Sequence, residues 1–445
     1  MMSRKNPNTN EIVLRCGTIV TMNHERPVLK NMDIHVQEGI IISIQPSRSC
    51  PAQYPDLVEF IDAEEALVIP GLVNAHTHVA MTLFRGLADD LPLRQWLFEK
   101  IFPAEAEHLS PETVYWGALL GCIEMIASGT TCFSDGYFFQ DQTMLAAHKA
   151  GIRALIGQGV IDFPAPGVSD PKKNLEIGEQ FIEKWLNFSD LLTPSLFCHS
   201  PVTCSEDTLT GALDICRSHR VPLQIHLSET QDEISTIVQQ KGRRPVEYLD
   251  QLGLLSEDLI AAHVVHLDER EMAILRDRGV KVVHVPESNM KLASGVSRPA
   301  EMIRMGIPVG IGTDGPASNN DLDLFMEMDT AAKLSKVYTG DPTSLKAWAV
   351  LRMATIGGAA VLGLAEQIGS IEEGKRADMV VLDLQQPHLQ PMYDPVSTVV
   401  YSASGGDVRD VIIDGKVIMK NREFVSLDTQ EAAWHVRRIA ENIHP

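Results

Sequence analysis

Residues 71–78 read GLVNAHTH, an apolar run that ends in two histidines separated by a single residue. Side chains two positions apart on a β-strand point to the same face, so we expect His76 and His78 to share one face at a strand end. Seven further short apolar runs follow along the chain. They span residues 129–135, 152–162, 191–201, 221–229, 259–267, 280–288 and 307–315.

Stretches of helical composition separate most of these runs, for example at residues 111–129 and 206–220. Eight strand–helix alternations over about 300 residues predict an α/β protein whose strands close into a (β/α)8 barrel of the TIM type. An open doubly wound sheet would need a glycine-rich nucleotide turn, and the sequence contains no GxGxxG or GxxxxGK[ST] motif. The barrel is therefore the predicted architecture.

Both ends of the chain are rich in β-branched residues and turn signals rather than in helical periods. An Asp414-Gly415 pair inside residues 410–419 predicts a hairpin. We expect the two ends to pair into one small β-sandwich beside the barrel. The other predicted strands lie at residues 11–22, 32–44, 58–69, 377–384 and 398–404, and a final helix at 427–443. The predicted domains are residues 1–68 (sandwich, first part), 69–366 (barrel) and 367–445 (sandwich, second part, with the C-terminal helix).

Composition narrows the class of protein. The chain has 445 residues, of which 44% are apolar and 22% charged, as in an ordinary globular protein. A formal net charge of −21 repels phosphate backbones and anionic lipid, which argues against nucleic-acid and membrane partners. The sequence contains no uninterrupted run of about 18 apolar residues, so we expect no transmembrane helix. Seven cysteines without a CxxC pair, and no apolar leader, predict a reducing compartment, the cytoplasm.

Ligand-type residues recur where predicted strands should meet the upper loops of the barrel, the face at which barrel enzymes keep their sites. His226, His263 and Asp314 stand at the ends of the fifth, sixth and eighth runs. A lone histidine there is more often a hydrogen-bonded core group, but the whole set with His76 and His78 predicts a catalytic metal. Zinc is the first choice, and iron or manganese would also fit. The fourth run has no lysine that could bridge a second metal, so we expect one ion.

The chemistry of such a site is hydrolytic. A bound divalent cation lowers the pKa of its water from 15.7 to roughly 7, and a nearby carboxylate and imidazole can shuttle protons. Glu229 lies three residues after His226, so we expect its side chain to hang over the pocket rather than to bind the metal. The alternative is a carboxylate that serves a helix N-terminus, because Ser228-Glu229-Thr230 also resembles a cap.

Five segments carry a resemblance to a known family: PGLVNAHTH (70–78), IHLSET (225–230), AAHVVHL (261–267), IGTDGPASNN (311–320) and GSIEEGKRADMVVLD (369–383). Over nearly its whole length the chain resembles the amidohydrolase superfamily, and within it the 5-methylthioadenosine/S-adenosylhomocysteine deaminases. The resemblance implies conversion of an adenine base to hypoxanthine with loss of ammonia. It implies that the metal is held by His76, His78, His226 and Asp314. It also implies that Glu229 protonates the purine ring nitrogen, and that His263 and Asp314 orient and deprotonate the attacking water.

The same resemblance suggests how a nucleoside would be held. Trp96 would pack on it, Glu105 would accept hydrogen bonds from the ribose hydroxyls, and His199 and Ser318 would contact the substrate. The residues alone favour a core tryptophan and a solvated glutamate instead. Gln158 stands where members that accept S-adenosylhomocysteine are expected to carry arginine, and a neutral amide is a poor carboxylate clamp. We therefore expect 5′-methylthioadenosine and adenosine as substrates, with S-adenosylhomocysteine weaker.

Other functions remain as alternatives. A related amidohydrolase could act on guanine, cytosine or an s-triazine, although Trp96 and Glu105 favour a nucleoside. The HxE…PCxxC signature of the cytidine deaminase fold is absent. A non-catalytic barrel scaffold would be expected to lose metal ligands, and a dinucleotide-dependent oxidoreductase needs a phosphate-binding motif that the sequence lacks. A homo-oligomer is possible, because relatives commonly associate.

Overall fold

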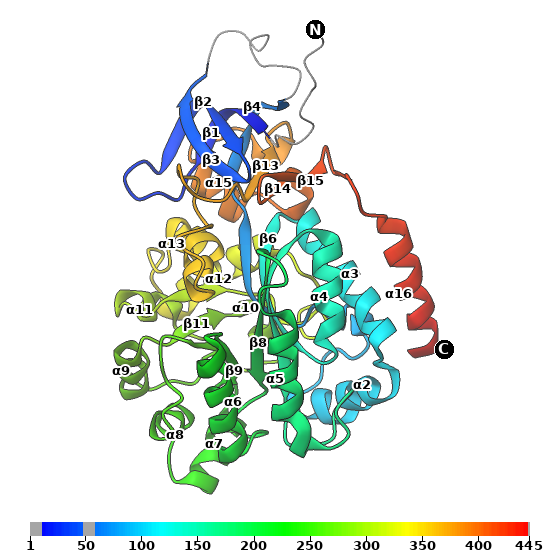
Figure 1. The fold of residues 1–445 in the computed structure, drawn as a ribbon. Helices are drawn as coiled ribbons and strands as arrows, with labels where there is room; N and C mark the ends of the chain where they lie inside the picture. Colours follow the sequence, from blue (N-terminus) through cyan, green and yellow to red (C-terminus); the bar gives the residue numbers. More distant parts are fainter. Residues whose placement is uncertain (1–10, 48–57, 444–445) are drawn as a thin grey trace.

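Eight parallel strands form a barrel at the centre of the molecule, which a computed structural model describes for residues 11–47 and 58–443 (Figure 1). The strands are hydrogen-bonded in chain order. They are β5 (Leu72–Thr77), β6 (Thr130–Tyr137), β7 (Arg153–Val160), β8 (Leu192–Cys198), β9 (Leu223–Leu227), β10 (Leu259–His263), β11 (Lys281–His284) and β12 (Val309–Ile311). Seven of them lie within the predicted runs, and β6 extends two residues beyond its run at 129–135, so the predicted α/β barrel is confirmed.

The barrel closes where its last strand meets its first. Beyond β12, the Asp314 N–H donates to the His76 carbonyl (3.0 Å) and the Thr313 N–H donates to Asn74 Oδ1 (3.1 Å). Both partners belong to β5. Closure therefore brings the carboxylate after the last strand beside the histidines of the first strand, residues that are more than 200 positions apart in the chain.

Helices cover the outside of the barrel (Figure 1). A typical one is α9 (Glu269–Arg278): Asp268 caps its N-terminus in a capping box with Glu271, and Gly279 ends it in the left-handed region, φ 70°. Further helical segments between and after the strands are α3 (Pro111–Ala127), α4 (Gln140–Ala150), η4 (Pro171–Lys173), α5 (Asn174–Trp185), α6 (Glu206–His219), α7 (Gln231–Lys241), α8 (Pro245–Gln251), α10 (Pro286–Lys291), α11 (Pro299–Arg304), α12 (Leu324–Thr339), α13 (Ala347–Arg352), η5 (Met353–Gly357) and α14 (Gly358–Val361).

A second sheet combines both ends of the chain, as predicted, and lies at the top of Figure 1. Its order is β16-β15-β14-β13-β4-β1-β2-β3. Ile41 of β3 and Ile412 of β14, far apart in this order, belong to one buried cluster, so the sheet bends around its own core. The strands are β1 (Glu11–Val20), β2 (Val28–Gln37), β3 (Ile40–Pro46), β4 (Glu59–Pro70), β13 (Met379–Asp383), β14 (Val408–Ile413), β15 (Lys416–Lys420) and β16 (Glu423–Phe424).

The predicted hairpin is confirmed. Ile413 of β14 pairs with Lys416 of β15, and the two residues between them are both left-handed, with φ 51° at Asp414 and 68° at Gly415. Such a turn matches the twist of the flanking strands, and Asp-Gly is a favoured sequence for it.

The strand predicted at residues 398–404 is wrong. Those residues fall mostly in α15 (Pro395–Tyr401), flanked by η6 (Pro387–Leu389) and η7 (Gly405–Asp407). The Asp394 side chain accepts hydrogen bonds from the N–H groups of Val396 (2.9 Å) and Ser397 (3.4 Å), and Pro395 occupies the first helical position. An aspartate cap followed by proline starts a helix, and here it outweighs the β-branched composition that suggested a strand.

The connection between sheet and barrel is a single residue long. β4 ends at Pro70 and β5 begins at Leu72. Gly71 between them packs so tightly that a Cβ would lie 2.0 Å from Thr131 Oγ1. The predicted domain limits at 68/69 and 366/367 stay predictions, and the first ten residues and Cys50 lie outside the described part of the chain.

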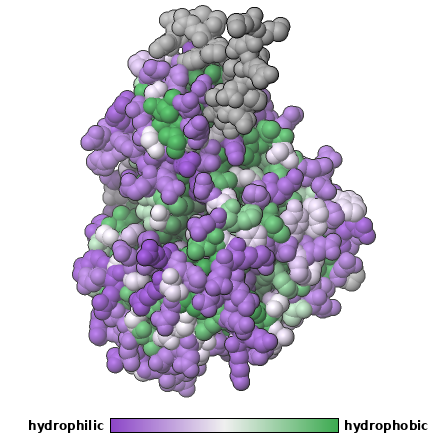
Figure 2. Space-filling view, viewed as in Figure 1, coloured by the Kyte–Doolittle hydropathy of each residue, from purple (hydrophilic) through white to green (hydrophobic). Residues whose placement is uncertain are grey.

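The C-terminal helix α16 (Thr429–Ile443) lies along the side of the barrel against α3, where the rings of Trp116 and His435 stack at 3.6 Å (Figure 1). The visible face of the molecule is mainly hydrophilic, with scattered apolar residues (Figure 2). Among the helices of residues 11–47 and 58–443, none has the length and apolarity that a bilayer crossing requires.

Candidate metal and substrate site

The two histidines of the first strand point into a shared buried cluster. His76 lies near the end of β5 and is 2% exposed, and its Nε2 hydrogen-bonds to no described residue. His78 follows the strand, and its Nδ1 donates to the Gly136 carbonyl at 2.5 Å. That bond leaves the lone pair of His78 Nε2 free to face the cluster.

Four side chains from distant strands converge there. Ligand-type atoms of His76, His226, His263 and Asp314 all lie within 4.8 Å of one another. His78 joins the same cluster, because its Nε2 lies 3.2 Å from His226 Nε2 and 3.2 Å from Asp314 Oδ1. An unpartnered buried imidazole nitrogen beside other nitrogens and a carboxylate oxygen is the donor set that a divalent metal satisfies. The residues present therefore fit a metal.

Burial and charge act differently on the donors of the cluster, and although burial opposes it, the pKa of His78 is raised to about 8 because Asp314 favours its protonated form. Burial lowers the pKa of His76 to about 4 and holds that of His226 well below its ordinary value. Burial alone would raise the pKa of Asp314, but the neighbouring His76 and His78 imidazoles hold it well below the usual range. His76 and His226 are therefore neutral and Asp314 is ionised, which are the forms that bind metal, while His78 would have to lose its proton to bind.

Asp314 is held in one orientation. Ser288 Oγ (2.6 Å) and Ser318 Oγ (2.9 Å) both donate to its Oδ2, and the Thr77 hydroxyl donates to its backbone carbonyl (2.8 Å). Its φ of 60° is a left-handed conformation that costs a non-glycine residue of order 1–3 kcal/mol. These contacts hold the strained residue in place and leave Oδ1 facing the histidines, 3.2 Å from His78 and 3.4 Å from His76.

Glu229 and His263 lie next to the cluster. His263 Nδ1 donates to Asn289 Oδ1 (2.9 Å), and its Nε2 lies 3.9 Å from Glu229 Oε2. Ser294 Oγ donates to the other oxygen of Glu229 at 3.3 Å. Burial raises the pKa of Glu229. An acid and an imidazole thus stand side by side at the edge of the candidate metal site.

A cavity of about 1230 Å³ opens above these residues, at the ends of the barrel strands. It is larger than most small-molecule sites and combines polar groups with an apolar wall. The predicted site residues on its wall are His78, Trp96, Glu105, His199, His226, Glu229, His263, Asp314 and Ser318. His76 lies in the cluster below.

The loop after β5 supplies the part of the wall on which Trp96 and Glu105 stand. It contains η2 (Val79–Phe84), α1 (Leu93–Gln95), η3 (Trp96–Ile101) and α2 (Phe102–His108). Trp96 is 6% exposed, and Tyr137 OH donates to Glu105 Oε1 at 2.5 Å. His199 shares a hydrogen bond with Thr203 (2.8 Å), and burial lowers its pKa to about 4, so it offers a neutral ring.

Glu105 gives a pH-dependent prediction. It is 3% exposed, and burial raises the pKa of its carboxyl from 4.5 to about 7. The folded protein therefore holds this proton more tightly than the unfolded chain, and the stability that the proton brings is full below pH 4.5 and is lost as pH rises through about 7. Glutamine stays neutral, so Glu105→Gln is expected to raise the free energy of unfolding by about 3 kcal/mol at pH 8 and by about 1 kcal/mol at pH 5.

Urea unfolding at both pH values measures this difference. Glu107→Gln on the same helix is the matched control, because the Glu107 side chain is 77% exposed and should show little change at either pH. An equal effect of Glu105→Gln at pH 5 and pH 8 would contradict the prediction.

The structure places Gln158 outside the cavity. Its side chain is 5% exposed; Oε1 accepts the Gln140 N–H (3.4 Å) and Nε2 donates to the Gly159 carbonyl (3.4 Å). Gly159 and Val160 reach the wall instead. The cavity does contain one guanidinium, that of Arg94, which lies over the Phe98 ring at 6.0 Å.

The structure adds contacts that the sequence analysis missed. Three hydrogen bonds to site residues had no local sequence signal, because each partner comes from another part of the chain. They join Tyr137 to Glu105, Asn289 to His263 and Ser288 to Asp314. Glu233 accepts the backbone N–H groups of Ser228 and Glu229. The Thr230-x-x-Glu233 spacing of a capping box could have drawn attention to Glu233.

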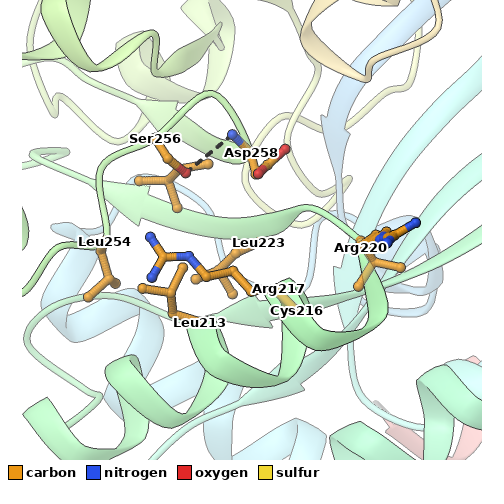
Figure 3. Close-up of a pocket in the computed structure, with 10 residues that line it drawn as sticks. Leu213, Cys216, Arg217, Arg220, Leu223, Leu254, Ser256 and Asp258 are labelled. Atoms are coloured by element: carbon orange, nitrogen blue, oxygen red, sulfur yellow. Dashed lines mark hydrogen bonds between the residues drawn. The ribbon is translucent and has the colours of Figure 1, made fainter.

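A second, smaller pocket of about 160 Å³ lies where β9 and β10 begin, at the other end of the barrel (Figure 3). Arg217 donates to the Gly253 carbonyl (3.2 Å), and burial raises the pKa of the Cys216 thiol to about 12. The thiol is unreactive, Arg217 is partnered, and no group of metal-ligating side chains among the described residues lies in this pocket.

Comparisons with known proteins agree with this geometry. A 5-methylthioadenosine/S-adenosylhomocysteine deaminase of Syntrophobacter fumaroxidans is 45% identical over 435 residues, 98% of this chain and 99% of that protein. A 5′-deoxyadenosine deaminase of Methanopyrus kandleri is 44% identical over 418 residues, 94% of this chain and 96% of that protein.

Solved structures give the same picture. The crystal structure of an adenosine deaminase from Xanthomonas campestris with bound zinc superposes with a TM-score of 0.94 at 38% identity, covering 97% of this chain and 98% of that one. An E. coli guanine deaminase at 22% identity and a TM-score of 0.83, covering 92% and 99%, shares the fold. Because the model of the amidohydrolase family matches residues 67–418, most of its length, the chain belongs to the amidohydrolase family.

Proposed function

We propose that this protein is a metal-dependent hydrolytic deaminase that converts the adenine base of 5′-substituted adenosines to hypoxanthine and releases ammonia. One observation carries the proposal: ligand-type atoms of His76, His226, His263 and Asp314 converge at the base of a single cavity, where His263 also lies beside the buried Glu229. Relatives that are 41–45% identical over nearly the full chain are named for deamination of such nucleosides, which supports it.

The metal would be held by His76, His78, His226 and Asp314, and we propose zinc as the ion. Bound there, it would lower the pKa of water to roughly 7 and so supply a nucleophile at neutral pH. His78 is preferred to His263 as a ligand because its Nε2 is 3.2 Å from both His226 Nε2 and Asp314 Oδ1. His263 Nε2 instead faces Glu229.

The proton transfers fall to the residues around this cluster. Glu229, whose pKa is raised by burial, would hold a proton and give it to the purine ring nitrogen beside the reacting carbon. His263 and Asp314 would orient the attacking water and take its proton. The proton taken from water would pass to the exocyclic amine, the carbon–nitrogen bond breaks and ammonia leaves, and the remaining hydroxyl proton returns to Glu229 as the carbonyl of hypoxanthine forms.

The rest of the wall fits a nucleoside with an apolar 5′-group. Glu105 would accept the ribose hydroxyls, and Trp96 would pack on the nucleoside. Phe98 is 52% exposed and Val202 41% exposed, and both line the cavity, so a thioether could cover apolar surface that otherwise faces water. The Phe98 and Phe102 rings meet edge to face at 5.3 Å and extend this wall.

The ranking of S-adenosylhomocysteine below 5′-methylthioadenosine stays a prediction. Its original basis, a missing arginine at Gln158, loses its force because Gln158 does not reach the cavity. Arg94 does reach it and could receive a carboxylate. We propose the cytoplasm as the compartment, because the described cysteines that the structure places are free and buried. A homo-oligomer stays a prediction.

An ammonia-release panel tests the proposal. Zinc-loaded protein should deaminate 5′-methylthioadenosine and adenosine, with measurable activity on S-adenosylhomocysteine, and should leave guanine, cytosine and a chlorotriazine unchanged. Faster turnover of guanine, cytosine or the triazine would show that the nucleoside is not the substrate and would favour the related amidohydrolase activity. No turnover by protein that holds about one metal ion per chain would favour a non-catalytic barrel.

A further inference from the structure

The buried carboxylate of Glu233 lies directly beneath the turn that carries Glu229. Glu233 is the third residue of α7, and its own N–H is capped by the Thr230 hydroxyl at 3.2 Å. Its side chain is 9% exposed. Oε1 accepts the Ser228 N–H (2.7 Å) and Oε2 accepts the Glu229 N–H (2.9 Å). Both oxygens of one carboxylate thus hold two successive backbone amides.

This arrangement differs from an ordinary capping box. In a capping box the third helical residue returns to the N–H of the capping residue itself. Glu271 does so in the next strand–helix unit, where its carboxylate accepts the N–H of Asp268, the cap of α9, at 3.1 Å. Glu233 reaches past its cap, Thr230, to the two residues before it. Closing the helix end does not require this reach.

The turn that Glu233 holds is strained and connects two parts of the site. Ser228 has φ 52°, a left-handed conformation that is rare for a residue other than glycine. Its carbonyl accepts the N–H groups of Val265 (3.0 Å) and His266 (2.9 Å), which follow His263 in the chain. With Glu233 on the N–H side and the loop after β10 on the carbonyl side, this one peptide sets the positions of Glu229 and His263 relative to each other.

We propose that Glu233 is a positioning residue for the reaction: its carboxylate fixes the Ser228–Glu229 backbone and thereby places the Glu229 side chain against His263 and the substrate. This inference rests on the proposed function of Glu229. A carboxylate can accept both amides at once, whereas a glutamine of the same size presents one oxygen and an NH₂ group that faces an N–H donor. Glu233→Gln therefore breaks the arrangement without changing side-chain volume.

Hydrogen exchange tests the backbone part of the proposal without any substrate. In Glu233→Gln, the peptide that covers residues 223–231 should exchange faster than in the unchanged protein, while peptides from β6 and β7 should not. Glu271→Gln is the matched control, since it removes a buried carboxylate from the same helical position outside the cavity wall and should leave residues 223–231 protected. Unchanged exchange at 223–231 in Glu233→Gln would overturn the proposal.

Kinetics on zinc-loaded protein test the catalytic part. Misplacing a reacting group by about 1 Å can cost on the order of 100-fold, so kcat for 5′-methylthioadenosine should fall roughly 10- to 100-fold in Glu233→Gln, with KM changed less than about threefold. In a Glu229→Gln background the same substitution should cost little more, because it acts through Glu229. A full additional loss there, or an equal loss in Glu271→Gln, would show that Glu233 supports only the fold.

The two proposals fail in different ways. If the unchanged protein turns over none of the adenine nucleosides, the proposed function fails, while hydrogen exchange still decides whether Glu233 holds the turn. If the protein is an active deaminase and Glu233→Gln keeps its full kcat, the positioning role is wrong and the proposed function stands.

Discussion

Glu229→Gln is expected to lower kcat for 5′-methylthioadenosine by about 10³-fold while KM changes only a few-fold, within the range by which general acid catalysis accelerates reactions. Glutamine keeps the size of the side chain and can still accept the Ser294 hydroxyl, which lies 3.3 Å from Glu229 Oε1. It has no proton of suitable acidity to give to the purine ring. The loss should therefore appear in the chemical step rather than in binding.

Steady-state ammonia release measures this effect, and metal analysis provides the control. Glu229 lies 3.9 Å from His263 and outside the four proposed ligands, so the variant should hold as much zinc as the unchanged protein. Glu247→Gln, which removes an ion pair (2.9 Å) between a partly buried Glu247 and an exposed Arg270 on the outer helices, should keep full activity. A Glu229→Gln enzyme within threefold of normal kcat would rule out Glu229 as the acid.

Asp314→Asn is expected to abolish activity, by more than about 10³-fold, and to leave less than about 0.2 metal ion per chain after purification, because it removes the one anionic ligand. Asp314 is also proposed to orient and deprotonate the attacking water, so its proposed roles as ligand and base disappear together. The substitution breaks an interaction at the centre of the cluster, where Oδ1 lies 3.2 Å from His78 Nε2.

Metal content per chain and turnover should fall together in this variant, and excess zinc should restore only part of the metal content. Asp277→Asn changes an exposed carboxylate paired with its neighbour Arg276 and should alter neither quantity. Thermal unfolding of both variants separates metal loss from misfolding. Full metal occupancy in Asp314→Asn, with turnover near normal, would exclude the proposed ligand set.

The barrel and its order of strands were predictable because buried parallel strands read as short apolar runs and helices as longer mixed stretches. The positions of His76 and Asp314 at the ends of such runs could be placed for the same reason. Residues 398–404 show the limit of this reasoning. Thr398, Val399 and Val400 suit a strand by composition, but the Asp394 cap and Pro395 upstream commit them to a helix.

Side-chain direction was less predictable than strand position. Gln158 lies on β7 as expected. Its side-chain amide, however, hydrogen-bonds to the backbone of Gln140 and Gly159 and does not line the cavity. Which strand residues reach the wall depends on helices packed behind the strand. A strand read alone contains no information about Gln140, which begins the helix before β7 and whose N–H donates to the Gln158 side chain.

The kinds of donor, their order along the chain and the strand ends on which they stand were all present in the amino-acid sequence, because local alternation decides which face of a strand a side chain takes. The tertiary structure alone decided what surrounds them. Several hydrogen bonds depend on the closed barrel and its packed loops. They are those of Ser288 to Asp314, of Tyr137 to Glu105, and of the left-handed Ser228 to the Glu233 carboxylate. A strained turn or an oriented carboxylate persists only when contacts from several elements hold it at once. No local stretch of sequence encodes that combination of contacts.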